Sequence, residues 1–186
     1  MVSADDVISI CRLLSSNGIE VWLTGGWGID ALLGLQTRPH HDLDAIMLVD
    51  DVIRLLELMD QEGYSYTELW SENLWTVDAH GARTETAFFL RDADGREFDA
   101  HAMRLDEQGN GIPAWDKAEG FIFTPQYLSG EGTVAGYPIR CMSPEYQMVS
   151  HTGYDLPDKQ LPDLQRLYEK FAVEYPKEIS RIIYRK

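Results

Sequence analysis

Basic side chains are scarce in this sequence. Its 186 residues include 16 Lys and Arg against 31 Asp and Glu, which gives a net charge of −15 at pH 7. Proteins that hold DNA or RNA by the backbone neutralise phosphates with Lys and Arg, and so acidic a surface repels those phosphates. We therefore expect no nucleic-acid partner, and a small or cationic ligand suits the charge better.

Long apolar runs and cysteines are also few. The most apolar region, 21–35, is interrupted by four glycines and an aspartate, and it falls short of the roughly 18 apolar residues that cross a bilayer. The first ten residues carry no Lys or Arg, so the charged head of a secretory signal is missing. Cys11 and Cys141 stand far apart and fit reduced thiols. We expect a cytoplasmic protein with no membrane partner.

Apolar and aromatic residues, in contrast, make up 44% and 11% of the chain. This is enough to bury a core, which excludes a disordered acidic tail. A chain of this length forms one domain or slightly more. We expect a main domain over 1–104, an irregular connection with short strands over 105–143, and a helical region over 144–186.

The hydrophobic pattern switches between the period of a helix and that of a strand. Ser3 and Asp6 form a capping pattern for a first helix, which Asn17-Gly18 ends. Further helices are expected at 27–33, 52–63, 145–154, 161–175 and 176–184. Strands are expected at 20–24, 43–49, 65–69, 74–78, 84–90, 96–103 and 137–141. This order predicts an α/β protein of the α+β type, with a mixed, mostly antiparallel sheet flanked by helices and a C-terminal helical region.

Asp42 and Asp44 stand on the strand expected at 43–49. Residues at i and i+2 of a strand project from one face, so the two carboxylates could share a divalent cation. In an acidic protein, an isolated Asp-x-Asp is more often a polar strand end or a cap. Asp99 changes this interpretation, because it lies inside the otherwise apolar strand EFDAHAM, where an unpaired carboxylate is costly. The three aspartates form the cluster that magnesium and a triphosphate require.

Gly25 and Gly26 stand where a strand passes into a helix, and Gly26 precedes Asp42 by sixteen residues. The backbone N–H groups at a helix start favour an anion, and glycine lets the backbone approach it closely. The sequence is not a Walker A loop, because Gly-Lys-Ser/Thr is missing, and GGWG lacks the Rossmann spacing. The pairing of this turn with the aspartates predicts a phosphate site.

Together these features resemble the nucleotidyltransferases of the DNA-polymerase-β-like superfamily, whose mark is a Gly-Gly or Gly-Ser turn, a helix, Asp-x-Asp and a third aspartate. The matching segments are GGWGIDALLG, Arg38 and His40 before Asp42-Leu43-Asp44, Asp99-Ala100-His101, and HTGYDL. They are most similar to the short lincosamide nucleotidyltransferases and more distantly to aminoglycoside 2″-nucleotidyltransferase. The resemblance implies a nucleotidyltransferase fold, with 1–104 as the catalytic domain.

The resemblance also implies roles for the matched residues. Asp42 and Asp44 would hold two magnesium ions, and Asp99 would bind one of them and take the proton of the reacting hydroxyl. Gly25 and Gly26 would contact the triphosphate of ATP or another nucleotide. Gly26 departs from the many superfamily members that have serine at this place, so backbone contacts would have to suffice there.

Two basic residues complete the expected nucleotide site. Lys159 matches the superfamily's Lys-x-x-x-Asp signature, and we expect it at or before a helix start. Arg38 could bind phosphates or could pair with a surface carboxylate. For the acceptor we expect His151, Tyr154 and Asp155, which would share one face of one helical stretch; Asp155 could instead cap or pair at the surface.

The reaction implied is metal-dependent transfer of a nucleoside monophosphate, AMP from ATP in the first place, to a hydroxyl of a small cationic antibiotic such as a lincosamide, with release of pyrophosphate. One alternative is an aminoglycoside acceptor. Another is a regulatory or antitoxin-type module that keeps the fold without turnover, although the retained aspartates oppose it. A homodimer could complete the pocket.

Overall fold

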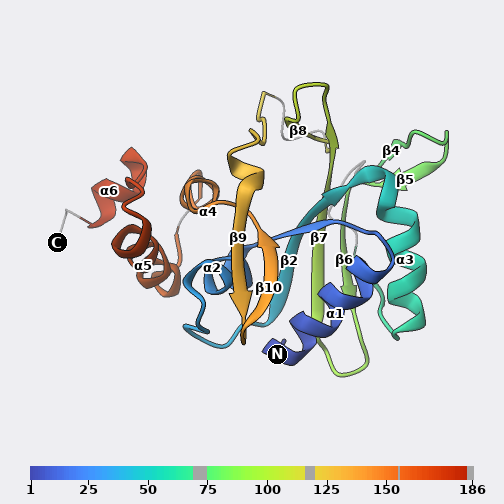
Figure 1. Cartoon of the computed structure of the whole chain (residues 1–186), viewed down its shortest axis with the longest axis horizontal. Coiled ribbons are helices and arrows are strands. Elements are labelled where there is room, and N and C mark those ends of the chain that lie inside the picture. The colour runs from blue at the N-terminus through green and yellow to red at the C-terminus, as the bar shows by residue number, and fades with distance from the viewer. Residues whose placement is uncertain (69–74, 116–119, 155, 184–186) are drawn as a thin grey trace.

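The computed structural model describes residues 1–68, 75–115, 120–154 and 156–183 (Figure 1). Its helices are α1 (Ala4–Ser16), α2 (Gly25–Leu33), α3 (Val52–Gln61), α4 (Pro144–Ser150), α5 (Leu161–Phe171) and α6 (Lys177–Ile183). Its strands are β1 (Val21–Thr24), β2 (Asp42–Leu48), β3 (Ser65–Glu68), β4 (Trp75–Val77), β5 (Arg83–Glu85), β6 (Ala87–Arg91), β7 (Glu97–Leu105), β8 (Gly111–Pro113), β9 (Gly130–Val134) and β10 (Tyr137–Cys141).

One mixed sheet forms the centre of the molecule. Its strands follow the order β3-β6-β7-β2-β1-β10-β9, and β8 pairs with β7 outside this path. β2 runs parallel to β7 and β1 parallel to β10, whereas the other neighbours in this sheet are antiparallel. The predicted mixed, mostly antiparallel sheet is therefore confirmed. Figure 1 shows α5 and α6 at the β9 end of the molecule and α3 toward the opposite end.

The two faces of the sheet are covered differently. Leu43, Ala45 and Met47 of β2 point into the main core, which α1, α2 and α3 close. Ile46 points to the opposite face and joins a smaller cluster, whose other buried members are Trp22, Met103, Phe123 and Met142. Because side chains alternate along a strand, Asp42 and Asp44 share the face of this smaller cluster.

Local signals set the first two helices. Ser3 and Asp6 form the predicted capping box of α1, with Ser3 N–H donating to the Asp6 carboxylate at 2.8 Å. Gly34 ends α2 in the left-handed conformation, with φ +74. Among the residues described, no helix combines the length and the apolar character needed to cross a membrane.

Several later elements differ from the sequence prediction. The strand expected at 84–90 divides into β5 and β6, because β5 pairs with β4 in a separate hairpin while β6 joins the central sheet. The helix expected at 161–175 ends at Phe171, since Ala172 adopts a left-handed conformation with φ +55. The central sheet also continues past residue 104, because β8, β9 and β10 belong to it.

Candidate active site

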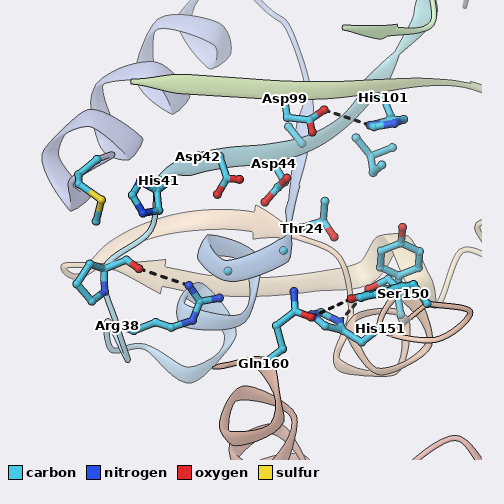
Figure 2. Close-up of a pocket in the computed structure, with 18 of the residues that line it drawn as sticks. Thr24, Arg38, His41, Asp42, Asp44, Asp99, His101, Ser150, His151 and Gln160 are labelled. Carbon is cyan, nitrogen blue, oxygen red and sulfur yellow. Dashed lines mark hydrogen bonds and ion pairs between the residues drawn. The ribbon is translucent and has the colours of Figure 1, made fainter. Parts of the chain in front are cut away.

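A cavity of about 710 Å³ opens over the sheet where β1, β2 and β7 run side by side (Figure 2). Thr24, Asp44 and Asp99 are direct neighbours across these three strands. The start of α2 borders the cavity on one side, and residues of α4 and of the segment after it border another. Three adjacent strands and two helical segments therefore meet at one polar hollow.

The three expected aspartates all line this cavity. Asp42 and Asp44 project from the same face of β2, while Leu43 between them is fully buried on the other face. Asp99 is the register partner of Asp44, because β2 and β7 are parallel neighbours. Figure 2 shows the three carboxylates around the same space.

The charges of the other two carboxylates act on the pKa of Asp44. Burial raises the pKa of Asp44 well above its usual range, the charges of Asp42 and Asp99 raise it further, and Arg38 opposes both effects. Asp99 Oδ1 is buried and accepts no hydrogen bond from the described residues, although His101 Nδ1 lies 3.4 Å away. Among the described residues, no three His, Cys, Asp or Glu side chains are arranged so that they could hold a metal ion as they stand. An oxygen-rich set with repelling charges and an unsatisfied oxygen suits a hard cation such as Mg²⁺.

The two glycines that open α2 make room for neighbouring side chains. Gly25 has φ +58, and a Cβ atom there would lie 2.1 Å from Asp44 Oδ2. A Cβ atom on Gly26 would lie 2.1 Å from Nδ1 of His40. That ring is buried, and its Nε2 lies 2.5 Å from Asp30 Oδ2. The His40 ring thus explains why position 26 holds glycine rather than serine.

The start of α2 keeps backbone N–H groups available to a ligand. Thr24 occupies the N-cap position but makes no capping hydrogen bond. Its hydroxyl instead donates to Gln147 Oε1 at 3.4 Å. The first N–H groups of a helix have no partner within the helix and carry partial positive charge. Because Thr24, Gly25 and Gly26 all line the cavity, this helix start can bind an anion there.

Arg38 lines the cavity and also pairs with a carboxylate. Its Nε donates to Asp163 Oδ2 at 2.9 Å, and Asp163 is only 1% exposed. The partner is therefore a buried carboxylate on α5, not a surface one as the sequence alternative supposed. The charge of Arg38 still reaches the cavity, since it lowers the pKa of Asp44 and of His151.

His151 and Tyr154 line the cavity, but the prediction that they share a helix face is wrong. α4 ends at Ser150, and Gly153 adopts φ +84 in the turn that follows, so the helix cannot continue to Tyr154. His151 Nδ1 donates to Gln147 O at 2.6 Å. Burial lowers the pKa of His151, which keeps its ring neutral near pH 7.

Two expected residues are not fully described. Asp155 lies outside the described residues. The backbone of Lys159 lies in a 3-10 turn (Asp158–Gln160) directly before α5, at the helix start where the sequence placed it. Its side chain also lies outside the part that the structure describes.

Three further cavity residues, His101, Tyr146 and Gln160, received no role from the sequence. His101 packs edge-on against Trp115, with ring centroids 5.0 Å apart. Burial raises the pKa of Tyr146 to about 12, with a further contribution from the charge of Asp44. Strand alternation does place His101 on the same face as Asp99, two residues earlier, but it assigns the ring no role. Nothing local marks Tyr146 or Gln160, because their positions depend on how α4 and the segment before α5 pack.

This fold, with a glycine-led helix beside strand carboxylates, is that of a nucleotidyltransferase. A solved structure of the lincosamide antibiotic adenylyltransferase LnuA, with lincomycin bound, matches 89% of this chain and 96% of its own at a TM-score of 0.73 and 25% identity. The chain belongs to the aminoglycoside-2″-adenylyltransferase family, whose family model matches residues 6–167. A structure of ANT(2″)-Ia in complex with adenylyl-2″-tobramycin shows the same fold, at a TM-score of 0.64 and 20% identity over 98% of this chain and 96% of its own.

Two relatives of known function are similar in sequence. A lincosamide resistance protein from Staphylococcus haemolyticus is 26% identical over 166 residues, which cover 89% of this chain and 94% of the relative. A 2″-aminoglycoside nucleotidyltransferase from Klebsiella pneumoniae is 30% identical over 139 residues, which cover 72% of this chain and 64% of the relative. The predicted membership among these nucleotidyltransferases is confirmed, and the chain is an enzyme of this class.

Proposed function

We propose that this protein transfers AMP from ATP to a hydroxyl group of a lincosamide-type antibiotic and releases pyrophosphate. The observation that carries the proposal is the register of Asp44 and Asp99 across β2 and β7, at the edge where Gly25 opens α2. This arrangement puts carboxylates for a divalent cation next to a helix start for phosphates. The lincosamide resistance protein, matched over 94% of its length, supports the acceptor class.

Asp42, Asp44 and Asp99 are the residues that would hold magnesium, two ions in this proposal. Bound magnesium lowers the pKa of the reacting hydroxyl and neutralises charge on the leaving pyrophosphate. The protein contributes the oxygen donors, which the sheet register fixes side by side. Asp99 Oδ1 accepts no hydrogen bond from the described residues, which supports Asp99 as the group that takes the proton.

In the reaction, the acceptor oxygen bonds to the α-phosphorus while the bond from that phosphorus to the bridging oxygen breaks. Pyrophosphate leaves, and the hydroxyl proton passes to Asp99. The backbone N–H groups of Gly25 and Gly26 and the guanidinium of Arg38 would bind the β- and γ-phosphates. We add Lys159 to this set from its sequence signature.

The acceptor would lie against the aromatic and helical side of the cavity. Trp115, Tyr146, His151 and Tyr154 line that side, and all four are uncharged near pH 7. Such a wall suits an acceptor that combines apolar surface with one amine. We propose Asp155, adjacent in sequence to Tyr154, as the carboxylate that contacts the amine. Aminoglycosides are the second candidate class, because the family model and the Klebsiella pneumoniae relative are named for them.

Incubation with ATP and magnesium tests the proposal. A panel of lincosamides and aminoglycosides is read by mass spectrometry for an added AMP and by an assay for pyrophosphate. We expect an adduct and equimolar pyrophosphate with a lincosamide, and neither with EDTA present. Modification of aminoglycosides alone would move the proposal to that class. If no member of either class accepts a nucleotide, the acceptor assignment is wrong.

The proposal also includes a cytoplasmic location and no nucleic-acid partner, in line with two free thiols and a charge of −15. A homodimer that completes the pocket belongs to it as well. Light scattering on the purified protein, with and without nucleotide, decides the oligomeric state.

A further inference from the structure

Among the side chains that the structure describes, Arg38 is the only Lys or Arg that lines the cavity. Its side chain is 25% exposed, and its Nε donates to Asp163 Oδ2 at 2.9 Å. Its Nη1 lies 3.4 Å from Pro39 O. One edge of the guanidinium is therefore held by the protein. Because Arg38 lines the cavity and its side chain is partly exposed, its positive charge faces any ligand bound there.

Asp163 reaches Arg38 from α5, 125 residues further along the chain. It is 1% exposed and lies outside the cavity lining. A buried carboxylate is costly unless it is paired and hydrogen-bonded. Arg38 Nε and, at 3.4 Å, Arg166 Nη1 donate to Asp163, and the Thr37 hydroxyl, whose proton goes to Asp30, lies 3.4 Å away. Arg38 and Thr37 belong to the connection between α2 and β2, so Asp163 fixes that connection against α5.

The same connection is held by a second buried carboxylate. Asp30 Oδ1 accepts hydrogen bonds from the Thr37 backbone N–H at 3.1 Å and from its hydroxyl at 2.7 Å. Asp30 Oδ2 contacts His40 Nε2. The residues on both sides of Arg38 are thus anchored before any ligand arrives. A side chain ordered in advance loses less entropy when it binds an anion.

We infer that Asp163 is a positioning residue that orients Arg38 toward the triphosphate. The inference rests on the proposed function, in which the cavity binds a nucleoside triphosphate. Asp163 accepts the Nε–H of Arg38 and so fixes the orientation of the guanidinium. Its Nη N–H groups then point toward the triphosphate site. It acts on the nucleotide only through Arg38.

Titration calorimetry with inorganic tripolyphosphate and magnesium tests this without any acceptor or base preference. We expect Asp163→Asn to raise the Kd about tenfold, as for the loss of one well-placed charged contact. Arg38→Gln should raise it by a similar factor. The double variant Asp163→Asn/Arg38→Gln should bind no more weakly than Arg38→Gln alone, because the two residues act as one unit.

Arg166→Gln is the matched control. Arg166 touches the same carboxylate, but its side chain is 43% exposed and lies outside the cavity lining. The Arg166→Gln variant should bind tripolyphosphate with the Kd of the wild type. In steady-state kinetics, Asp163→Asn should raise the KM for ATP while kcat stays within about twofold.

Three results would overturn the positioning role. The first is an Asp163→Asn variant that loses stability but keeps the wild-type Kd. The second is a double variant whose increase in Kd equals the product of the two single increases. The third is a wild-type protein that shows no magnesium-dependent binding of tripolyphosphate. If the expected Kd values hold while no antibiotic is modified, the proposed acceptor fails and the role of Asp163 stands.

Discussion

At the scale of single residues, the pKa of Asp44 stands well above its usual range. Burial and the charges of Asp42 and Asp99 all oppose its ionisation. We expect Asp44→Asn to abolish transfer, because a ligand of the metal is lost, without lowering the free energy of unfolding measured in EDTA. Asp60→Asn, at an exposed position on α3, is the control and should transfer normally. Normal turnover by Asp44→Asn would refute the metal assignment.

Asp99 has a different predicted phenotype, because its proposed work is on the acceptor proton. We expect Asp99→Asn to lower kcat by about 10²–10⁴-fold, the usual range for a lost acid or base. Binding of tripolyphosphate, measured by calorimetry, should weaken by only a few fold. If binding is lost as completely as in Asp44→Asn, Asp99 serves mainly as a metal ligand and another group takes the proton.

His151 makes the free energy of unfolding depend on pH. Burial lowers its pKa, with Arg38 acting in the same direction, while the bond to Gln147 and the charge of Asp163 act the other way. The unfolded chain takes up a proton near pH 6.5 and the folded chain does so only at lower pH, so the free energy of unfolding falls as the pH drops below about 6.5.

Urea unfolding from about pH 7.5 to about pH 5.5 should therefore show the wild type losing stability relative to His151→Gln, which cannot titrate. Equal pH slopes for the two proteins would show that the ring is protonated as readily in the folded chain as in the unfolded one.

At the scale of elements, the unit formed by β1, α2 and β2 was predictable because its signals are local. Glycines mark the start and end of α2, and alternation in β2 separates carboxylates from core residues. The contact of Asp163 with Arg38 was not predictable, because it depends on how α5 packs. The parallel pairing of β10 with β1, in which Cys141 lies opposite Leu23, was not predictable either. Pairing between distant segments leaves no pattern within either one.

The start of α2 offers a test of packing between elements. A Cβ atom on Gly26 would meet the buried His40 ring, so Gly26→Ala should cost about 1–3 kcal/mol of stability and reduce transfer. In the double variant Gly26→Ala/His40→Ala the clash is gone, and the loss should be smaller than the sum of the single losses.

Gly25→Ala is the comparison. Adding His40→Ala should not restore the stability lost in Gly25→Ala, because alanine is strained at the φ of +58 that position 25 adopts and its Cβ atom would meet Asp44. Urea unfolding of all five variants measures the coupling. Additive losses for Gly26 and His40 would show that the helix start moves to accommodate the extra atom.

At the scale of the whole molecule, the main hydrophobic core and the proposed catalytic carboxylates lie on opposite faces of the central sheet. All six helices that the structure describes contribute to a large core on one face of the sheet, so the other face can carry three carboxylates at its edge. The site then draws on parts of the chain that are far apart, from Met1 to Gln160. Truncation within the C-terminal helices should therefore affect the site, since α5 supplies Asp163.

The net charge of −15 should act in opposite ways on the two substrates. A cationic acceptor is attracted and a magnesium–nucleotide anion is repelled, and salt screens both effects. Raising NaCl from about 50 to about 300 mM should lower kcat/KM for a protonated lincosamide severalfold and leave kcat/KM for the nucleotide unchanged or higher. The control is the same acceptor at a pH where its amine is neutral, for which the salt effect should vanish. An equal decline for both substrates would mean that salt acts on the enzyme itself, and charge would then have no part in selecting the acceptor.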